Sequence, residues 1–187
     1  DLHVVLGANL LTLVYRAQNP NNAELARSAL QDLRDVVSRA GAESVPLAYA
    51  MADYRIECEK RLSDVQIKLH WHNQVDDDSL HLTQPQALNF GRIIREAIST
   101  VNRHAQASEV NITLQSTEHH LELLIQDNGI GLQSDTDKSK GRGLGNIQKR
   151  AALLGGDVHF GPSDHGGLRL CIAIPQSSLS YQHPAAI

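Results

Sequence analysis

The sequence has few cysteines, few aromatic residues and no excess of basic charge. Two cysteines, Cys58 and Cys171, occur in 187 residues. They have no metal-ligand or redox spacing, and a disulfide framework would need more of them, so we expect a reducing compartment. Acidic residues outnumber basic ones by 21 to 17. This balance gives no indication of nucleic acid as a partner, and any phosphate binding must be local.

Long apolar runs are also missing. No stretch approaches the roughly 18–20 residues that a membrane-spanning helix needs, and no signal-peptide pattern is found. Because 41% of the residues are apolar, the chain can still bury at least one sizeable core. We expect a soluble segment that makes no membrane contact itself, with membrane or sensory segments of a longer protein preceding Asp1.

Two stretches near the N-terminus have apolar residues at helical spacing. The first covers residues 2–16 and stops at the turn signal Asn19-Pro20-Asn21-Asn22, and the second ends at Gly41. Each helix of such a hairpin leaves part of its apolar stripe uncovered, and a second copy of the chain would bury the remainder. Residues 1–43 are therefore predicted to form a helical hairpin that builds a four-helix bundle in a homodimer.

After residue 43 the pattern changes to a mixture of helices and strands, which predicts a second domain over 44–175. Alternating residues indicate strands, and the order of elements favours helices on one face of a mixed sheet. The polar tail 176–187 is expected to fray. The predicted helices are 46–62, 84–104 and 146–154, and the predicted strands are 65–71, 109–116, 120–127, 157–161 and 168–174.

The predicted helix 84–104 has two different faces. Its polar face carries Glu96, Thr100, Arg103 and His104 at positions i, i+4, i+7 and i+8. A polar face that ends in Arg-His can bind phosphates, and a solvated helix face is the other interpretation that this helix alone leaves open. The apolar stripe consists of Phe90, Ile94, Ala97, Ile98 and Val101.

Two glycine-rich segments follow, "DNGIGL" at 127–132 and "GRGLGNIQKRAALLGG" at 141–156. Asp127 ends a predicted strand, where it can accept a hydrogen bond from an exocyclic amine, and the glycines after it allow a flat ring or a backbone to come close. The second segment places glycines before a predicted helix, whose free N–H groups favour phosphate oxygens. Neither segment is a Walker loop or a dinucleotide fingerprint. The long polar stretch between them predicts a functional lid.

Taken in order, "REAISTVNRHA", "DNGIGL" and "GRGLGNIQKRAALLGG" resemble the three nucleotide-binding boxes of the catalytic ATPase domain of two-component sensor histidine kinases. "DLHVVLGANLL" and "LARSALQDLRDVV" resemble the phospho-acceptor hairpin of the nitrate/nitrite-type sensor kinases, so the resemblance covers nearly all of 1–175. It implies an α+β fold with a GHKL-type sandwich like that of Hsp90, gyrase and MutL. It also implies ATP and Mg²⁺ as cofactors, and a cytoplasmic segment of a protein in the bacterial inner membrane.

The resemblance implies roles for single residues. His3 would be the phosphorylated histidine, and its phosphoryl group would pass to an aspartate of a response regulator. Asp127 would bind adenine, and Gly129 and Gly131 would let the ring approach. The lid over the phosphates would comprise Gly141, Gly143, Leu144 and Gly145.

On the helix, the resemblance places Glu96 beside the metal or beside a group that it polarises, and Arg103 and His104 against phosphates. Thr100 stands where the family has the asparagine that coordinates Mg²⁺, while Asn102 stands at an apolar position. Two residues along a helix correspond to a rotation of about 200°, so Asn102 cannot simply replace it. A threonine hydroxyl can still bind a hard cation, although less well than an amide carbonyl.

Other positions also depart from the family pattern. Val4 replaces the acid after the acceptor histidine, which holds the imidazole tautomer and takes its proton; such help is worth about 10²–10⁴ in rate. Ala8 stands where a Gln or Asn serves dephosphorylation of the regulator, with Asn9 one place late, and Leu168 stands where threonine is common.

These departures leave a second interpretation open, a degenerate dimeric scaffold that binds nucleotide with little or no phosphotransfer. A third, an ATPase of the gyrase, MutL and Hsp90 kind, shares the boxes, but the short upstream hairpin disfavours it.

Overall fold

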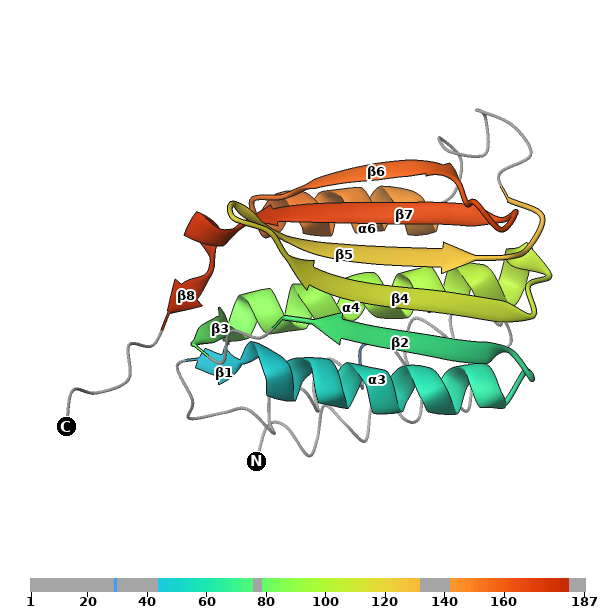
Figure 1. Ribbon diagram of the computed structural model, residues 1–187, viewed down its shortest axis with the longest axis horizontal. Coiled ribbons are helices and arrows are strands. Elements are labelled where there is room, and N and C mark those ends of the chain that lie inside the picture. The colour runs from blue at the N-terminus through green and yellow to red at the C-terminus, as the bar shows by residue number, and fades with distance from the viewer. Residues whose placement is uncertain (1–28, 30–43, 76–78, 132–141, 182–187) are drawn as a thin grey trace. The chain divides into compact units, whose positions relative to one another are not determined.

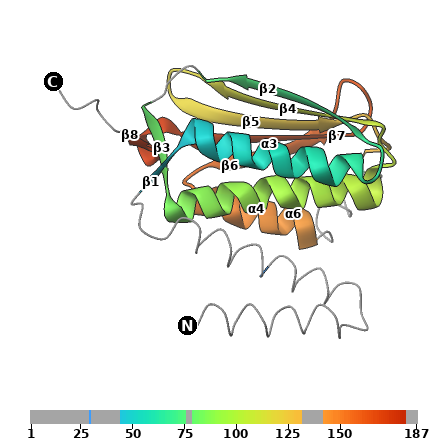
Figure 2. The ribbon, with the colours of Figure 1, turned by 90° about the horizontal axis from the view of Figure 1, so that it is seen from below.

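A mixed five-stranded sheet forms one layer of the domain that begins at Ser44, and helices cover one of its faces (Figures 1 and 2). The computed structural model describes residues 29, 44–75, 79–131 and 142–181. The strand order is β2-β4-β5-β7-β6, in which β2 and β4 run parallel and the other neighbours antiparallel. The strands are β2 (Lys68–Gln74), β4 (Glu109–Ser116), β5 (His120–Asp127), β6 (Asp157–Pro162) and β7 (Leu168–Pro175).

The core lies between the sheet and the helices α3 (Leu47–Ser63), α4 (Gln84–Thr100) and α6 (Arg142–Leu153). Burial alternates along β4 and β5, as expected for strands with one covered face. The hairpin predicted from that alternation is confirmed by the antiparallel pairing of β4 with β5. The apolar stripe predicted for α4 is confirmed as well, because all five of its residues are buried.

A second, smaller sheet was not predicted from the sequence. It consists of β1 (Ser44–Pro46), β3 (Leu80–Thr83) and β8 (Ser180–Tyr181), in the order β1-β3-β8. The expectation that the tail frays from Gln176 is wrong for residues 176–181: a 3₁₀ turn, η2 (Gln176–Ser178), leads into β8, which pairs with β3. Strands this short carry no periodicity that a sequence could reveal.

Two helix boundaries also differ from expectation. α6 begins at Arg142 instead of Asn146, so that Gly143 and Gly145 lie inside the helix and not before it. Glycine disfavours a helix interior, which is why the sequence suggested a loop there. The helix forms because Leu144 and Ile147 are buried against the core at helical spacing.

The second boundary is the C-terminal end of α4, which continues as a π-helix, η1 (Val101–Ala105). The chain leaves it at Gln106, in the left-handed region at φ 51°. Single π turns of this kind occur frequently at functional sites. The predictions that fall on 1–28, 30–43, 76–78, 132–141 and 182–187, including those for His3, the hairpin and Gly141, lie outside the described residues.

The N-terminus of α4 is fixed by a capping box. Thr83 accepts a hydrogen bond from the Gln86 backbone N–H, and the Thr83 N–H donates to the Gln86 side-chain oxygen. The Gln86 amide also donates to the Ser178 carbonyl. One side chain therefore joins the start of α4 to the C-terminal turn η2.

Removing this cap should destabilise the domain without touching its core. We expect Thr83→Ala to lower the free energy of unfolding by about 1 kcal/mol, because a helix N–H loses its acceptor. Urea unfolding followed by circular dichroism measures the effect. Thr83→Ser, which keeps the hydroxyl, should be close to wild type. An equal loss in both variants would contradict the capping role.

Candidate functional site

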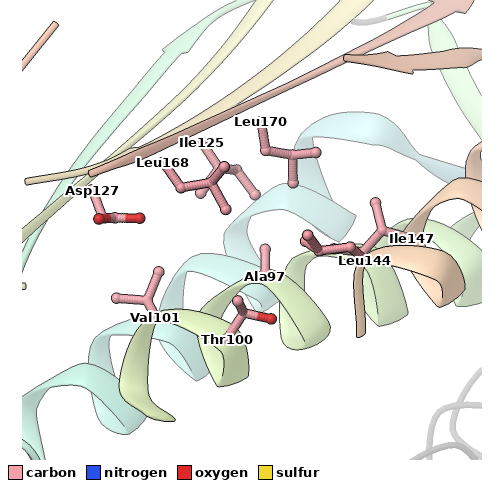
Figure 3. Close-up of a pocket in the computed structure, with 9 residues that line it drawn as sticks. All are labelled: Ala97, Thr100, Val101, Ile125, Asp127, Leu144, Ile147, Leu168 and Leu170. Atoms are coloured by element: carbon pink, nitrogen blue, oxygen red, sulfur yellow. The ribbon is translucent and has the colours of Figure 1, made fainter. Parts of the chain in front are cut away.

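A small pocket opens between α4, α6 and the sheet, with about 250 Å³ of empty space when its open mouth is counted. Most of its lining is apolar, and Asp127 and Thr100 supply the polar side chains (Figure 3). The sequence had indicated Asp127, Thr100 and Leu144 as binding residues, and the fold brings all three to this pocket. The lining residues are Ala97, Thr100, Val101, Ile125, Asp127, Leu144, Ile147, Leu168 and Leu170.

Asp127 is the last residue of β5 and is only 3% exposed. One carboxylate oxygen accepts a hydrogen bond from the Gly129 backbone N–H at 2.8 Å, and the Leu168 backbone N–H also bonds to this carboxylate. Burial raises the pKa of Asp127 above its ordinary value, and the two backbone donors act in the opposite direction. The carboxylate is thus a hydrogen-bond acceptor held at the wall of an apolar pocket.

The loop after Asp127 is attached to the segment between η1 and β4. The side-chain oxygen of Asn128 accepts hydrogen bonds from the backbone N–H groups of Ser108 and Glu109 at 2.9 and 3.0 Å. Its amide donates to the Ser108 hydroxyl at 2.9 Å. Asn128 was not singled out in the sequence, where Asn-Gly indicates only a turn. Its side chain fixes the loop that carries Asp127.

The glycines of this loop have a structural reason to be glycines. A Cβ on Gly129 would lie 2.0 Å from the carbonyl oxygen of Ala105 in η1, and one on Gly131 would lie 2.9 Å from the Gly167 carbonyl oxygen. The adjacent Ile130 N–H donates to the same Ala105 carbonyl at 2.8 Å. The close approach made by these glycines in the structure is therefore to backbone, and their approach to a ring stays a prediction.

Glu96 and Thr100 face the first turn of α6. A Cβ on Gly143 would lie 2.7 Å from a Glu96 carboxylate oxygen and 3.3 Å from the Thr100 hydroxyl oxygen. The Thr100 hydroxyl donates its proton to the Glu96 backbone carbonyl at 2.9 Å, which leaves the lone pairs of its oxygen available. The polar face predicted for this helix thus places two oxygen groups directly beneath α6.

Arg103 and His104 lie on η1, are exposed, and are not among the residues that line the pocket. The Arg103 guanidinium donates to the Ser99 backbone carbonyl at 3.3 Å. Asn102 is likewise exposed and outside the lining, so the structure gives it no position from which to replace Thr100. Among the described residues, no group of three or more His, Cys, Asp or Glu side chains could hold a metal ion.

The part of the chain that builds the pocket matches a known protein family. Residues 86–178 match the family described as the histidine kinase-, DNA gyrase B- and HSP90-like ATPases. The matched segment contains most of α4 together with η1, β5, α6 and β7, the elements that supply the lining residues of the pocket. This segment of the chain is a domain of that ATPase family. Its ATPase domain therefore has the GHKL-type fold that the three sequence boxes predicted.

Named relatives of the ATPase domain are sensor kinases. The nitrate/nitrite sensor protein NarX of Escherichia coli is 32% identical over 96 residues, which cover 51% of this chain and 16% of NarX. The sensor protein VraS of Staphylococcus saprophyticus is 37% identical over 84 residues, 45% of this chain and 24% of VraS. The chain therefore matches less than a quarter of the length of these relatives.

Solved structures share the fold at low sequence identity. The blue-light activated histidine kinase of Erythrobacter litoralis EL346 aligns with a TM-score of 0.66 at 17% identity, covering 82% of this chain and 55% of that one. The ATP binding domain of PrrB from Mycobacterium tuberculosis aligns with a TM-score of 0.56 at 20% identity, covering 72% and 98%. Within the described residues, no helix has the length and apolar character to cross a membrane.

The contact between Gly143 and Glu96 can be tested with a matched pair of variants. Gly143→Ala must displace the Glu96 carboxylate, whereas a Cβ on Gly145 meets nothing within 4 Å. Because losing an interaction with a charged group costs about tenfold or more in affinity, we expect Gly143→Ala to weaken Mg²⁺·ATP binding by about that factor, measured by calorimetry. Gly145→Ala, which displaces no carboxylate, should keep more of the wild-type affinity than Gly143→Ala. Each should unfold at equal or higher urea concentration, since Ala favours a helix. Equal binding by both variants would contradict the contact.

The buried Asp127 should cost stability at neutral pH. Its folded-state pKa is raised, so folding favours the protonated form, and that stability is present in acid and lost as the pH rises through the folded-state pKa. We expect Asp127→Asn to increase the free energy of unfolding at pH 7 and to have less effect at lower pH, in urea titrations of the unliganded protein. Asp157→Asn, at an exposed residue, is the control. A change at Asp127 that is independent of pH would contradict this account.

Proposed function

We propose that the chain is the kinase core of a sensor histidine kinase, which binds ATP with Mg²⁺, phosphorylates itself on His3 and passes the phosphoryl group to an aspartate of a response regulator. The observation that carries the proposal is the buried Asp127 carboxylate at the wall of an apolar pocket, in a domain whose named relatives are sensor kinases. On this proposal the chain acts as a homodimer and is the cytoplasmic part of a protein in the bacterial inner membrane.

The chemistry of the pocket fits an aminopurine. Apolar side chains from α4, the sheet and α6 suit the faces of a flat ring, and a carboxylate at the wall accepts a hydrogen bond from an exocyclic amine. Gly129 and Leu168 already donate to this carboxylate and hold it in place. Because Asp127 is only 3% exposed, a further carboxylate lone pair left without a donor is costly, so a ligand that brings a donor is favoured over one that does not.

The oxygen groups beneath α6 fit a magnesium ion that arrives with phosphates. Mg²⁺ prefers oxygen ligands and, in nucleotide sites, is bound through one or two side chains together with the phosphates. Thr100 has its lone pairs available because its proton is donated to the Glu96 carbonyl, and the Glu96 carboxylate lies beside the same glycine. Bound there, the ion would neutralise charge on the transferring phosphoryl group.

On this proposal His3 is the nucleophile. A neutral imidazole nitrogen forms a bond to the γ-phosphorus as the bond to the β,γ-bridging oxygen breaks, ADP leaves, and the ring releases its N–H proton to water. Catalysis of such a loose transition state depends mainly on in-line positioning and charge neutralisation. Arg103 and His104, exposed on η1, would supply positive or hydrogen-bonding groups to the phosphates. Val4 cannot take the proton, so the reaction is expected to be slow.

A second candidate is the dimeric scaffold that binds nucleotide with little or no phosphotransfer. It is favoured by Val4 at the acid position and by the place of Asn102, which is exposed and outside the pocket lining. Both candidates require a nucleotide in the same pocket. They differ in whether His3 is phosphorylated.

Incubation with Mg²⁺ and γ-labelled ATP distinguishes them. We expect acid-labile, base-stable label on the chain, absent from His3→Gln and increased by Val4→Asp by about 10²–10⁴ in rate, the usual contribution of a positioned base. Nucleotide binding without label, with label restored by Val4→Asp together with Thr100→Asn, would support the scaffold. Label that persists in His3→Gln would contradict the proposed acceptor, and absence of nucleotide binding would contradict both candidates.

A further inference from the structure

The turn between β6 and β7 lies beside Asp127, although it is about forty positions away from it in the sequence, and Leu168, the first residue of β7, lines the pocket. Antiparallel pairing of β5 with β7 places Gln126 opposite Arg169 and Ile125 opposite Leu170. Continued by one residue, the same register brings Asp127 to Leu168. The turn before Leu168 therefore has to pass beside the carboxylate.

Gly167 is the residue of this turn that touches Asp127. A Cβ on Gly167 would lie 2.2 Å from an Asp127 carboxylate oxygen and 2.3 Å from the Asp127 carbonyl oxygen. No side chain fits at such distances, so the Cα of Gly167 packs directly against the acid. A hydrogen bond of 3.1 Å from the Ser163 N–H to the Gly167 carbonyl oxygen holds this turn in place.

Backbone N–H groups of two other residues also contact the Asp127 carboxylate. The Leu168 backbone N–H bonds to the Asp127 carboxylate, and the Leu168 side chain lines the pocket. The Gly129 N–H donates to the same carboxylate. Asp127 thus accepts two backbone hydrogen bonds and is in contact with Gly167, which leaves it little freedom to adopt another rotamer.

We propose that Gly167 is a positioning residue of the pocket, which fixes the Asp127 carboxylate and so determines how strongly the site requires an amine on the ring that it binds. This inference rests on the proposed nucleotide binding and goes beyond it. A carboxylate that is free to turn away would still allow an apolar ring to enter. Only the selection for the amine would be lost.

Gly166 provides a matched control, because it lies in the same turn with the same kind of backbone. Gly166 has φ +84° and Gly167 has φ +70°. An alanine at either position is therefore destabilising to a similar extent, because both require the left-handed conformation. A Cβ on Gly166 would meet its nearest atom, the Gly129 carbonyl oxygen, at 3.4 Å, an ordinary contact. The two variants therefore differ mainly in the contact with Asp127.

The experiment compares ATP with purine riboside triphosphate, which lacks the 6-amino group, in equilibrium binding to the whole chain. Because a hydrogen bond to a charged group is worth roughly ten- to a hundredfold in affinity, we expect wild type and Gly166→Ala to prefer ATP by about that factor. Gly167→Ala should show a preference below about threefold. A partly unfolded variant loses apparent affinity for both nucleotides equally, so the ratio is insensitive to stability.

Gly167→Ala that keeps the wild-type preference would overturn the inference while leaving the proposed function intact. A wild-type chain that binds neither nucleotide would overturn both. Should Gly167→Ala not fold, the wild type itself is decisive: in an NMR titration, the amide protons of Gly129 and Leu168 should both shift with the ionisation of Asp127. A Leu168 amide that does not follow it would overturn the inference.

Discussion

Close approach of backbone to two carboxylates is the constraint on which the candidate site depends. Gly167 lies against Asp127 at distances that leave no room for a side chain, and a Cβ on Gly143 would displace the Glu96 carboxylate. In both places a glycine belongs to an element that crosses over the acid from elsewhere in the fold. The glycines thus allow α6 and the β6–β7 turn to pack closely on α4 and β5.

The buried position of Asp127 lowers the stability of the unliganded domain and would favour the binding of a ligand that donates a hydrogen bond. Removing a carboxylate from water raises its pKa and costs free energy in the unliganded domain. Two backbone donors offset part of this cost, and a ligand that donates a hydrogen bond would offset more. A residue that lowers the stability of the free protein while favouring the bound one is characteristic of functional positions, and the rest of the pocket lining, which is mainly apolar, shows no such conflict.

The sequence predicted the parts of the site that depend on local pattern. The sequence indicates Asp127 because a predicted strand ends there, and Glu96 and Thr100 because they share a helix face. Leu144 was indicated only by the resemblance to sensor kinases. Leu168 reaches the pocket, and Gly167 reaches Asp127, through the pairing of β5 with β7, and β8 exists only by pairing with β3, about one hundred positions earlier. Contacts of this kind leave no periodic signal. The start of α6 was misjudged because tertiary burial of Leu144 overrides the low helix propensity of its flanking glycines.

The small sheet determines where the chain enters and leaves the ATPase domain. Its entry strand β1 and its exit strand β8 flank the same central strand, β3, so the chain enters and leaves the domain at neighbouring places. Domains with adjacent ends tolerate insertion into other proteins and relocation of their termini. Thr83, the last residue of β3, is also the N-cap of α4, so the strand between the two ends leads directly into the helix that carries Glu96 and Thr100.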